Sequence, residues 1–293
     1  MSDLNLTAGA INNIHSTVMS DQDFNRLSGF ISSRCGIKLP PGKKTMLEGR
    51  LRKRLRSLGM DNFKDYCEYL FSETGLGDEC VHMVNMVTTN KTDFFRESHH
   101  FHFLTEMVLP ELTRKLGWGS RSNYLKVWSA GCSTGEEPYT LAMFLSEFAS
   151  TSPDFRFSIL ATDISTRVLE KARLAIYEHE TIDPVPLPWR KKYLLRSKDK
   201  GKRLVRIAPE LRQLVTFRHL NFLENNYGIR EPQAVIFCRN VLIYFEQSTQ
   251  LAVLQRLCQH LLPGGFLFIG HSETLHSLNL PLVQSAPTIY RKI

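Results

Sequence analysis

The chain has 293 residues, of which 42% are hydrophobic and 23% are charged, and its formal net charge is +8. These values are typical of an ordinary soluble globular protein that is long enough for two domains. The sequence contains no run of 18 apolar residues and no basic N-terminal segment followed by an apolar one. A membrane-spanning or secreted protein is therefore not expected, and we predict a cytoplasmic protein.

The cysteines agree with a reducing compartment. All six are scattered along the chain, and no two of them form a C-x-x-C pair. We therefore predict neither a disulfide framework nor a bound metal ion.

The positive charge is concentrated in two segments. Residues 38–56 hold eight basic residues and one acidic residue, and residues 190–206 hold nine basic residues and one acidic residue. Two such patches indicate a large acidic partner rather than a small substrate. Composition alone leaves open whether that partner is a nucleic acid or an acidic protein.

The first part of the chain is predicted to form a small helical domain over residues 19–87, after a flexible tail at residues 1–18. Ser20 and Asp23 resemble a capping box, and Gly36 is expected to end the first helix. A later helix with leucines along one face carries a basic outer surface, which is either a solvated face or a docking surface. Its basic residues are Arg50, Arg52, Lys53, Arg54 and Arg56.

Residues 88–123 are predicted to be a linker followed by a connecting helix. Phe94 and Phe95 are expected to pack on the next domain, because a plain linker would not need two aromatic residues. Arg96 beside them is either a surface cation or a group that reaches a negatively charged ligand. Pro110 is expected to interrupt or kink the connecting helix.

From Tyr124 onward, expected strands and helices alternate, which predicts an α/β fold with a mainly parallel sheet covered on both faces. Strands are expected at residues 124–130, 157–162, 214–221, 234–238 and 266–270, and helices at residues 135–148, 166–176 and 247–262. A two-residue alternation at residues 203–207 indicates an inserted hairpin. The segment 283–291 is expected to supply closing antiparallel strands.

Polar residues follow three of these expected strands. They are the turn from Gly131 to Glu137, Asp163, and the pair Arg239 and Asn240. In such sheets ligands bind beyond the carboxyl ends of the strands. Each group also has an ordinary structural interpretation, as a helix cap, a turn former or a complement to a helix dipole. Their placement at the ends of three strands favours a ligand site.

Five strings of residues in order then carry a resemblance to a known family. They are TTNKTDFFRE at 88–97, VWSAGCSTGEEPY at 127–139, ATDI at 161–164, IFCRNVLIYF at 236–245 and GHSE at 270–273. The chain resembles the CheR family, the S-adenosylmethionine-dependent methyltransferases of bacterial chemotaxis that esterify glutamates on chemoreceptors. The resemblance covers residues 20–291. It implies a Rossmann-like class I methyltransferase domain at 124–293, with an N-terminal all-α domain and a small antiparallel β-subdomain inserted at about residues 190–217.

The resemblance also implies roles for individual residues. It places Arg96 and Tyr244 near the transferable methyl group, and we expect the planar fork of Arg96 to orient the acceptor carboxylate with help from Tyr244. Glu137 would contact the methionine end of the cofactor, and Asp163 would hold the ribose hydroxyls. The implied cofactor-binding residues are Asn90, Thr92, Arg96, Gly131, Glu137, Asp163, Asn221, Phe222, Arg239 and Asn240.

The implied partner is the cytoplasmic helical domain of chemoreceptors, which are the methyl-accepting chemotaxis proteins, with the basic leucine helix as the docking surface. The inserted β-subdomain binds a receptor C-terminal peptide in some members of the family. The resemblance implies neither a nucleic-acid partner nor direct insertion into a membrane. S-adenosyl-L-homocysteine would be the product of the cofactor.

Three other functions remain open from the sequence. An RNA or DNA methyltransferase would suit the positive charge, but base-modifying enzymes of this class use an Asn/Asp-Pro-Pro-aromatic turn where this chain has Arg239, Asn240, Val241 and Leu242. A non-catalytic S-adenosylmethionine-binding receptor adaptor would share the same pocket. A nicotinamide oxidoreductase is disfavoured, because the turn at 131–135 departs from G-x-G-x-x-G.

Overall fold

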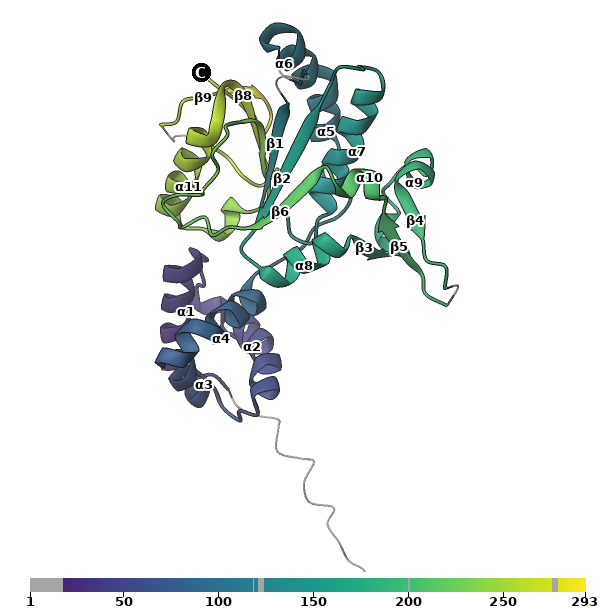
Figure 1. Cartoon of the computed structure of the whole chain (residues 1–293). Helices are drawn as coiled ribbons and strands as arrows, with labels where there is room; N and C mark the ends of the chain where they lie inside the picture. Colours follow the sequence, from purple (N-terminus) through teal and green to yellow (C-terminus); the bar gives the residue numbers. More distant parts are fainter. Residues whose placement is uncertain (1–17, 118, 121–123, 200, 276–278) are drawn as a thin grey trace, which may run out of the picture. The chain divides into compact units, whose positions relative to one another are not determined.

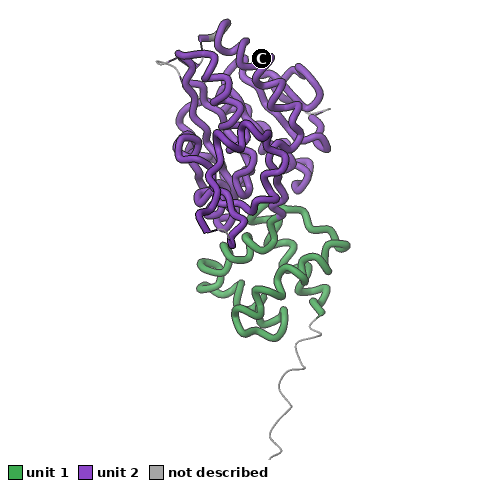
Figure 2. The backbone as a smooth tube through the Cα atoms, turned by 90° about the vertical axis from the view of Figure 1, so that its right-hand side faces the viewer, with its two compact units in different colours: residues 1–88 green, residues 89–293 purple. Residues whose placement is uncertain are grey.

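The computed structural model describes residues 18–117, 119–120, 124–199, 201–275 and 279–293, without the side chains of Lys115 and Leu116. The expected flexible tail at 1–18 therefore lies, except for Val18, outside the described residues. The chain divides into two compact units, residues 1–88 and 89–293 (Figure 2). Among the described residues, no helix combines the length and the apolar character needed to cross a membrane.

The first unit is all-helical in the part of it that the structure describes. It contains α1 (Asp21–Cys35), the short η1 (Pro41–Lys43), α2 (Lys44–Leu58), α3 (Phe63–Leu70) and α4 (Glu73–Val87). The Ser20 hydroxyl accepts a hydrogen bond from the Asp23 amide at 3.0 Å, so the predicted N-terminal cap is confirmed. Gly36 ends α1 in the left-handed conformation. Asn62 caps α3.

The second unit is built on a seven-stranded sheet with the order β6-β2-β1-β7-β8-β10-β9. The first five strands in that order are mutually parallel, and β10 pairs antiparallel with β8 and β9. This arrangement confirms the predicted mainly parallel sheet with closing antiparallel strands. The strands are β1 (Leu125–Ala130), β2 (Phe157–Asp163), β6 (Val215–His219), β7 (Gln233–Cys238), β8 (Leu261–Ile269), β9 (Leu282–Ala286) and β10 (Ile289–Lys292).

Helices cover both faces of this sheet, as predicted. One hydrophobic cluster joins alternate residues of the central strands to α7 (Glu136–Ser150) and α8 (Thr166–Leu174). A second cluster, on the opposite face of the strands, joins Trp128 and Ile236 to α11 (Gln247–His260). Figure 1 shows α11 on one side of the sheet and α5 and α7 on the other. Because β1 lies between β2 and β7, the carboxyl ends of these three strands meet where the strand order reverses.

The predicted connecting helix is present in three parts. These are α5 (His99–Phe103), the π-helical η2 (Leu104–Val108) and α6 (Leu109–Leu116). The Leu109 amide bonds the Leu104 carbonyl, five residues back. Pro110 follows at once and has no N–H to continue the normal ladder, so the widened turn accommodates its ring. The predicted interruption at Pro110 is thus a π turn rather than a break.

The inserted β-subdomain is a separate three-stranded antiparallel sheet with the order β3-β5-β4. Its strands are β3 (Ile176–Glu178), β4 (Leu194–Arg196) and β5 (Leu204–Ile207), and η3 (His179–Ile182), α9 (Leu187–Tyr193) and α10 (Pro209–Arg212) lie between or after them. The first strand precedes the range 190–217 that the sequence indicated. The chain enters β3 through Ala175 at φ 55°, where no glycine or proline marks the turn.

Candidate functional site

The turn after β1 approaches the loop after β7 closely. Gly131 has φ 89°, and a Cβ atom placed on it would lie 2.4 Å from Val241 Cγ2. The amides of Gly131 and Cys132 both donate to the Thr162 carbonyl near the end of β2. No larger residue fits at Gly131, so the main chain itself forms this wall of the site.

Asp163 ends β2, and the neighbouring main chain fixes its carboxylate. Oδ2 accepts from the Ser133 amide and Oδ1 from the Ser165 amide, both at 2.9 Å. Burial raises the pKa of this carboxyl, and the two amides oppose the rise because they stabilise the charged form. Each oxygen has a second lone pair, so the group can still accept two hydrogen bonds from a ligand.

Arg239 follows β7 and joins several segments of the site. Its side chain is 1% exposed and forms ion pairs of 3.1 Å with both Glu97 and Glu137. Its guanidinium also donates to the Arg96 carbonyl and lies over the Phe101 ring at 5.3 Å. The structure thus directs Arg239 toward groups of the protein itself, and we call Arg239, Glu97 and Glu137 the arginine clamp.

The two carboxyls of the arginine clamp differ in pKa. Burial opposes the ionisation of Glu97, but Arg239 and Asn240 outweigh it and hold the pKa of Glu97 below its usual value. Burial prevails at Glu137, whose pKa is raised despite Arg239 and a 2.7 Å hydrogen bond from Ser129. Beside the same guanidinium, Glu97 therefore ionises more readily than Glu137, because burial is the larger effect at Glu137.

The segment from Asn90 to Glu97 is held against the turn after β1. The Asn90 carbonyl accepts from the Ser133 hydroxyl at 2.9 Å, and the Arg96 guanidinium donates to the Lys91 carbonyl at 3.0 Å. Thr92 and Arg96 are half-buried. Phe95 and Glu97 have φ angles of 60° and 54°, which is unusual for residues with a side chain. Such conformations cluster at functional sites, where the surrounding structure enforces them.

A loop after β7 completes the polar edge. Asn240 has φ 58°, and its side-chain amide donates to Glu97 at 3.3 Å. The η4 turn (Leu242–Tyr244) follows and presents a half-buried Tyr244. Glu273 fixes this loop, because its buried carboxylate accepts from the amides of Asn240, Leu242 and Gly270 at 3.0, 2.7 and 2.6 Å. No local pattern in the sequence indicates a role for Glu97 or Glu273.

Two of the implied cofactor-binding residues, Asn221 and Phe222, lie after β6. Asn221 accepts from the Leu223 amide at 3.0 Å through its side chain. Phe222 is buried in the second hydrophobic cluster, with ring contacts to Tyr227 and Phe245 at 6.0 and 6.4 Å. The ring of Phe222 therefore packs into the core.

The basic residues of α2 in the first unit do not form a uniform surface. Arg54 is 19% exposed and forms a bidentate pair with Glu79, which also accepts from the Tyr66 hydroxyl. Arg50 donates to the Val87 carbonyl. These two arginines thus contribute to the packing of the helical unit, and their role in docking stays a prediction. The exposed basic residues of α2 are Arg52, Lys53 and Arg56.

The chain is similar to known proteins over most of its length. Residues 90–290 match the family model "CheR methyltransferase, SAM binding domain", and residues 22–88 match "CheR methyltransferase, all-alpha domain". The chain is 41% identical over 272 residues to a chemotaxis protein methyltransferase of Escherichia coli, covering 93% of this chain and 91% of the relative. It is 37% identical over 281 residues to one of Borreliella burgdorferi, covering 96% and 97%. Among solved structures, the DszA carbon methyltransferase aligns over 86% of this chain and 61% of its own, with 13% identity and a TM-score of 0.38.

Proposed function

Because the chain belongs to the CheR methyltransferase family, we propose that it transfers the methyl group of S-adenosylmethionine to glutamate side chains of chemoreceptors in the cytoplasm. The products would be glutamate methyl esters and S-adenosylhomocysteine. Relatives of nearly the same length are named chemotaxis protein methyltransferases, which supports this acceptor over RNA, DNA or a purely adaptor role.

The residues at the carboxyl edge of the sheet suit S-adenosylmethionine. Asp163 keeps two lone pairs for the ribose hydroxyls, and its rigid attachment to two amides sets their direction. Glu137 offers a carboxylate to an ammonium group, as at the methionine end of the cofactor. Gly131 lets the turn after β1 lie close against Val241 in the loop after β7, so these two walls of the proposed site stay together.

The chemistry then requires positioning more than proton transfer. S-adenosylmethionine supplies a methyl group that is already activated on a sulfonium centre. An ionised glutamate is a competent nucleophile, so the chain has to hold that carboxylate in line with the methyl group. We assign this task to Arg96, whose guanidinium can bind one face of a carboxylate, and we assign an assisting role to Tyr244.

The observation that carries the proposal is the arginine clamp. Arg239 bonds the main chain of Arg96 and the carboxylate of Glu137 at the same time. It therefore links the proposed acceptor-binding residue to the proposed cofactor-binding residue through one buried group. We propose that Arg239 acts as a positioning residue rather than as a direct ligand of the cofactor.

We propose that the receptor docks on the basic residues that the chain leaves exposed. The helical signalling domains of chemoreceptors are acidic, and the exposed face of α2 presents Arg52, Lys53 and Arg56 to such a surface. The β-subdomain carries the second basic segment and is the proposed site for a receptor C-terminal peptide.

A direct test compares acceptors. The purified chain is incubated with labelled S-adenosylmethionine and either the helical domain of a chemoreceptor or total RNA. We expect label in the receptor domain alone, and less label in a receptor domain whose acceptor glutamates are replaced by alanine. Label in RNA, or equal label in both receptor domains, would contradict the proposal.

A further inference from the structure

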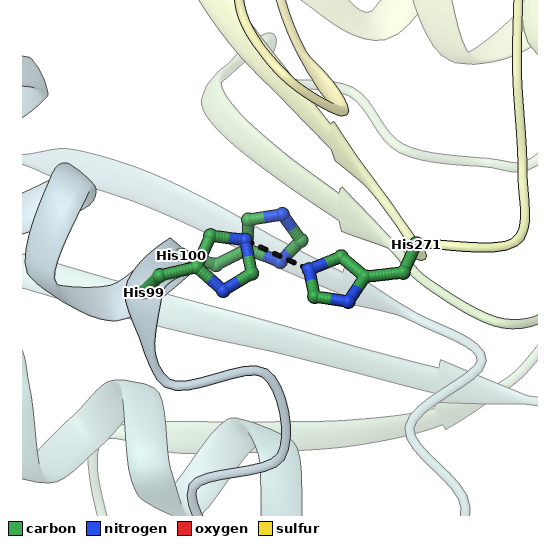
Figure 3. Close-up of side chains that lie close together, drawn as sticks. All are labelled: His99, His100 and His271. Atoms are coloured by element: carbon green, nitrogen blue, oxygen red, sulfur yellow. Dashed lines mark hydrogen bonds between the residues drawn. The ribbon is translucent and has the colours of Figure 1, made fainter.

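Three histidines from two distant parts of the chain meet beside the arginine clamp. His99 and His100 begin α5, and His271 follows β8 by two residues. One ring nitrogen from each lies within 4.8 Å of the other two, and Figure 3 shows the three rings turned toward one another. The neutral imidazole is a preferred ligand of zinc.

His100 provides a buried lone pair. Its Nε2 lies 2.7 Å from the Thr288 hydroxyl, which itself donates to the Pro287 carbonyl at 2.6 Å. A hydroxyl has one proton, so Thr288 accepts from His100, and the Nδ1 atom of His100 carries the lone pair. This Nδ1 is buried and has no hydrogen-bond partner among the described residues. An imidazole that donates one N–H to an oxygen and offers its other nitrogen is the usual arrangement of a histidine bound to a metal.

The charges around this lone pair favour a cation. The nearest carboxylate oxygen, Glu97 Oε2, lies 3.5 Å from His100 Nδ1. A lone pair that faces a carboxylate is unfavourable, and a cation bound beside the two groups would remove this repulsion. Arg239 repels a cation, but its positive charge is offset by the ion pairs that it forms with Glu97 and Glu137.

The other two rings already lie near the spacing of metal ligands. The Nε2 atoms of His99 and His271 are 3.0 Å apart, and two nitrogens on one tetrahedral zinc ion are about 3.4 Å apart. Both residues are exposed, so their side chains can turn toward the Nδ1 atom of His100.

From this geometry we propose that His99, His100 and His271 bind a divalent transition-metal ion, with Zn²⁺ as the best match, through one nitrogen each. Three histidines leave a fourth tetrahedral position for water or for a ligand group. All three ligands are neutral nitrogen donors, which suit zinc, cobalt and copper better than magnesium or calcium. The site is independent of the proposed function, because no residue of it is assigned to the cofactor or the acceptor.

The test is isothermal titration of the full chain, without a histidine tag, with zinc chloride, and visible absorption after addition of cobalt chloride. We expect one zinc ion per chain and the d–d bands of tetrahedral cobalt. His99→Ala and His271→Ala change exposed residues and should each weaken zinc binding by more than about 100-fold. Thr288→Val should weaken it by about 10–100-fold, because it removes the acceptor that orients His100.

The matched control is His102→Ala. His102 lies on the same helix and is exposed, but it faces Glu106 at 3.9 Å and is not part of the cluster. Zinc binding should be unchanged in this variant. The proposal is overturned if the unmodified chain binds no zinc, if His99→Ala and His271→Ala bind it as tightly as the unmodified chain, or if His102→Ala loses binding equally. Because these are binding measurements, they do not depend on whether the methyl acceptor has been identified correctly.

Discussion

The Arg239 guanidinium is almost fully buried. It forms ion pairs with two carboxylates and donates a hydrogen bond to one main-chain carbonyl. A buried charge is costly unless it is paired, so removing the guanidinium leaves two carboxyls without a counter-charge. At the scale of single residues, the site therefore depends on groups that hold each other in place before any ligand binds.

The first prediction concerns this clamp. Arg239→Ala should lower the free energy of unfolding by about 3–5 kcal/mol, since it breaks a buried ionic network. Denaturant titration measures this. The control Arg203→Ala removes an exposed ion pair with Glu180 and should cost less than about 1 kcal/mol. Equal losses in the two variants would show that the clamp adds nothing beyond a surface pair.

The second prediction concerns Arg96. If its guanidinium orients the acceptor, Arg96→Ala should reduce kcat/KM for methyl transfer by about 100-fold or more and change the affinity for S-adenosylhomocysteine much less. Transfer kinetics and calorimetric titration measure the two quantities. Arg96→Lys keeps the charge but loses the planar fork, so it should recover only part of the rate. A parallel loss of rate and cofactor affinity in Arg96→Ala would remove its orienting role.

The third prediction concerns Glu136, which is 5% exposed and has a pKa raised to about 7 by burial. Between pH 4.5 and 7 the folded chain keeps a proton on Glu136 that the unfolded chain has released. Stability therefore falls as pH rises through this window. Glu136→Gln should be more stable than the unmodified chain at pH 8.5, by on the order of 3 kcal/mol, and the difference should vanish below pH 4.5.

Glu147 on the same helix is the matched control. Burial would raise its pKa, but hydrogen bonds from Lys192 and Tyr193 outweigh burial and lower it. Its contribution to stability is present above its unfolded pKa and is lost as pH falls. Glu147→Gln should therefore be less stable than the unmodified chain at neutral pH. The same sign for both variants in thermal unfolding across pH would contradict these directions.

At the scale of the element, α2 shows a division of basic residues between the packing of the helical unit and its surface. Leu47, Leu51 and Leu55 are buried, Arg54 turns to the buried Glu79, and the basic residues left exposed are Arg52, Lys53 and Arg56. The helical period in the sequence identifies the apolar stripe. It does not indicate that Arg54 has a partner, because Glu79 lies on α4 and the pairing depends on how the two helices pack.

The fourth prediction follows from this division. Replacing Arg52, Lys53 and Arg56 together by glutamate should reduce receptor methylation by about tenfold or more, because rim charges steer association. It should also weaken the salt dependence of methylation, because fewer attractive charges remain for salt to screen. Binding of S-adenosylhomocysteine and the helical content should be unchanged. Arg54→Glu is a contrasting variant, since it places a negative charge against Glu79 and should unfold the helical unit. Unchanged receptor methylation in the triple variant would refute the docking surface.

The dependence of some pairs on packing between distant segments also explains what the sequence could and could not predict. The parallel sheet and the positions of Gly131, Asp163 and Asn240 follow from patterns within short segments, and the structure confirms the sheet. Other residues act through partners that lie more than 30 residues away in the chain. Glu97 and Glu273 both accept hydrogen bonds from Asn240, and Thr288 contacts His100. No local pattern encodes such pairs. The predicted insertion leaves out β3, because no turn-forming residue marks the entry to this strand.

At the scale of the whole molecule, we propose a separate role for each of the two units. The unit at 89–293 holds the S-adenosylmethionine site, and the exposed basic residues of the unit at 1–88 are available to an acidic partner. A net charge of +8 gives the chain a general attraction to acidic surfaces, but selection of a carboxylate must come from the site. The type of bond formed in the product is therefore the most informative property of the reaction.

The most direct measurement is the chemical stability of the transferred methyl group. The chain is incubated with methyl-labelled S-adenosylmethionine and membranes that contain chemoreceptors, and the labelled receptor is then treated with mild base. A glutamate methyl ester hydrolyses and releases the label as volatile methanol, which is the predicted result. Label that stays on the receptor in base would indicate methylation of nitrogen or another stable position and would contradict the proposed function.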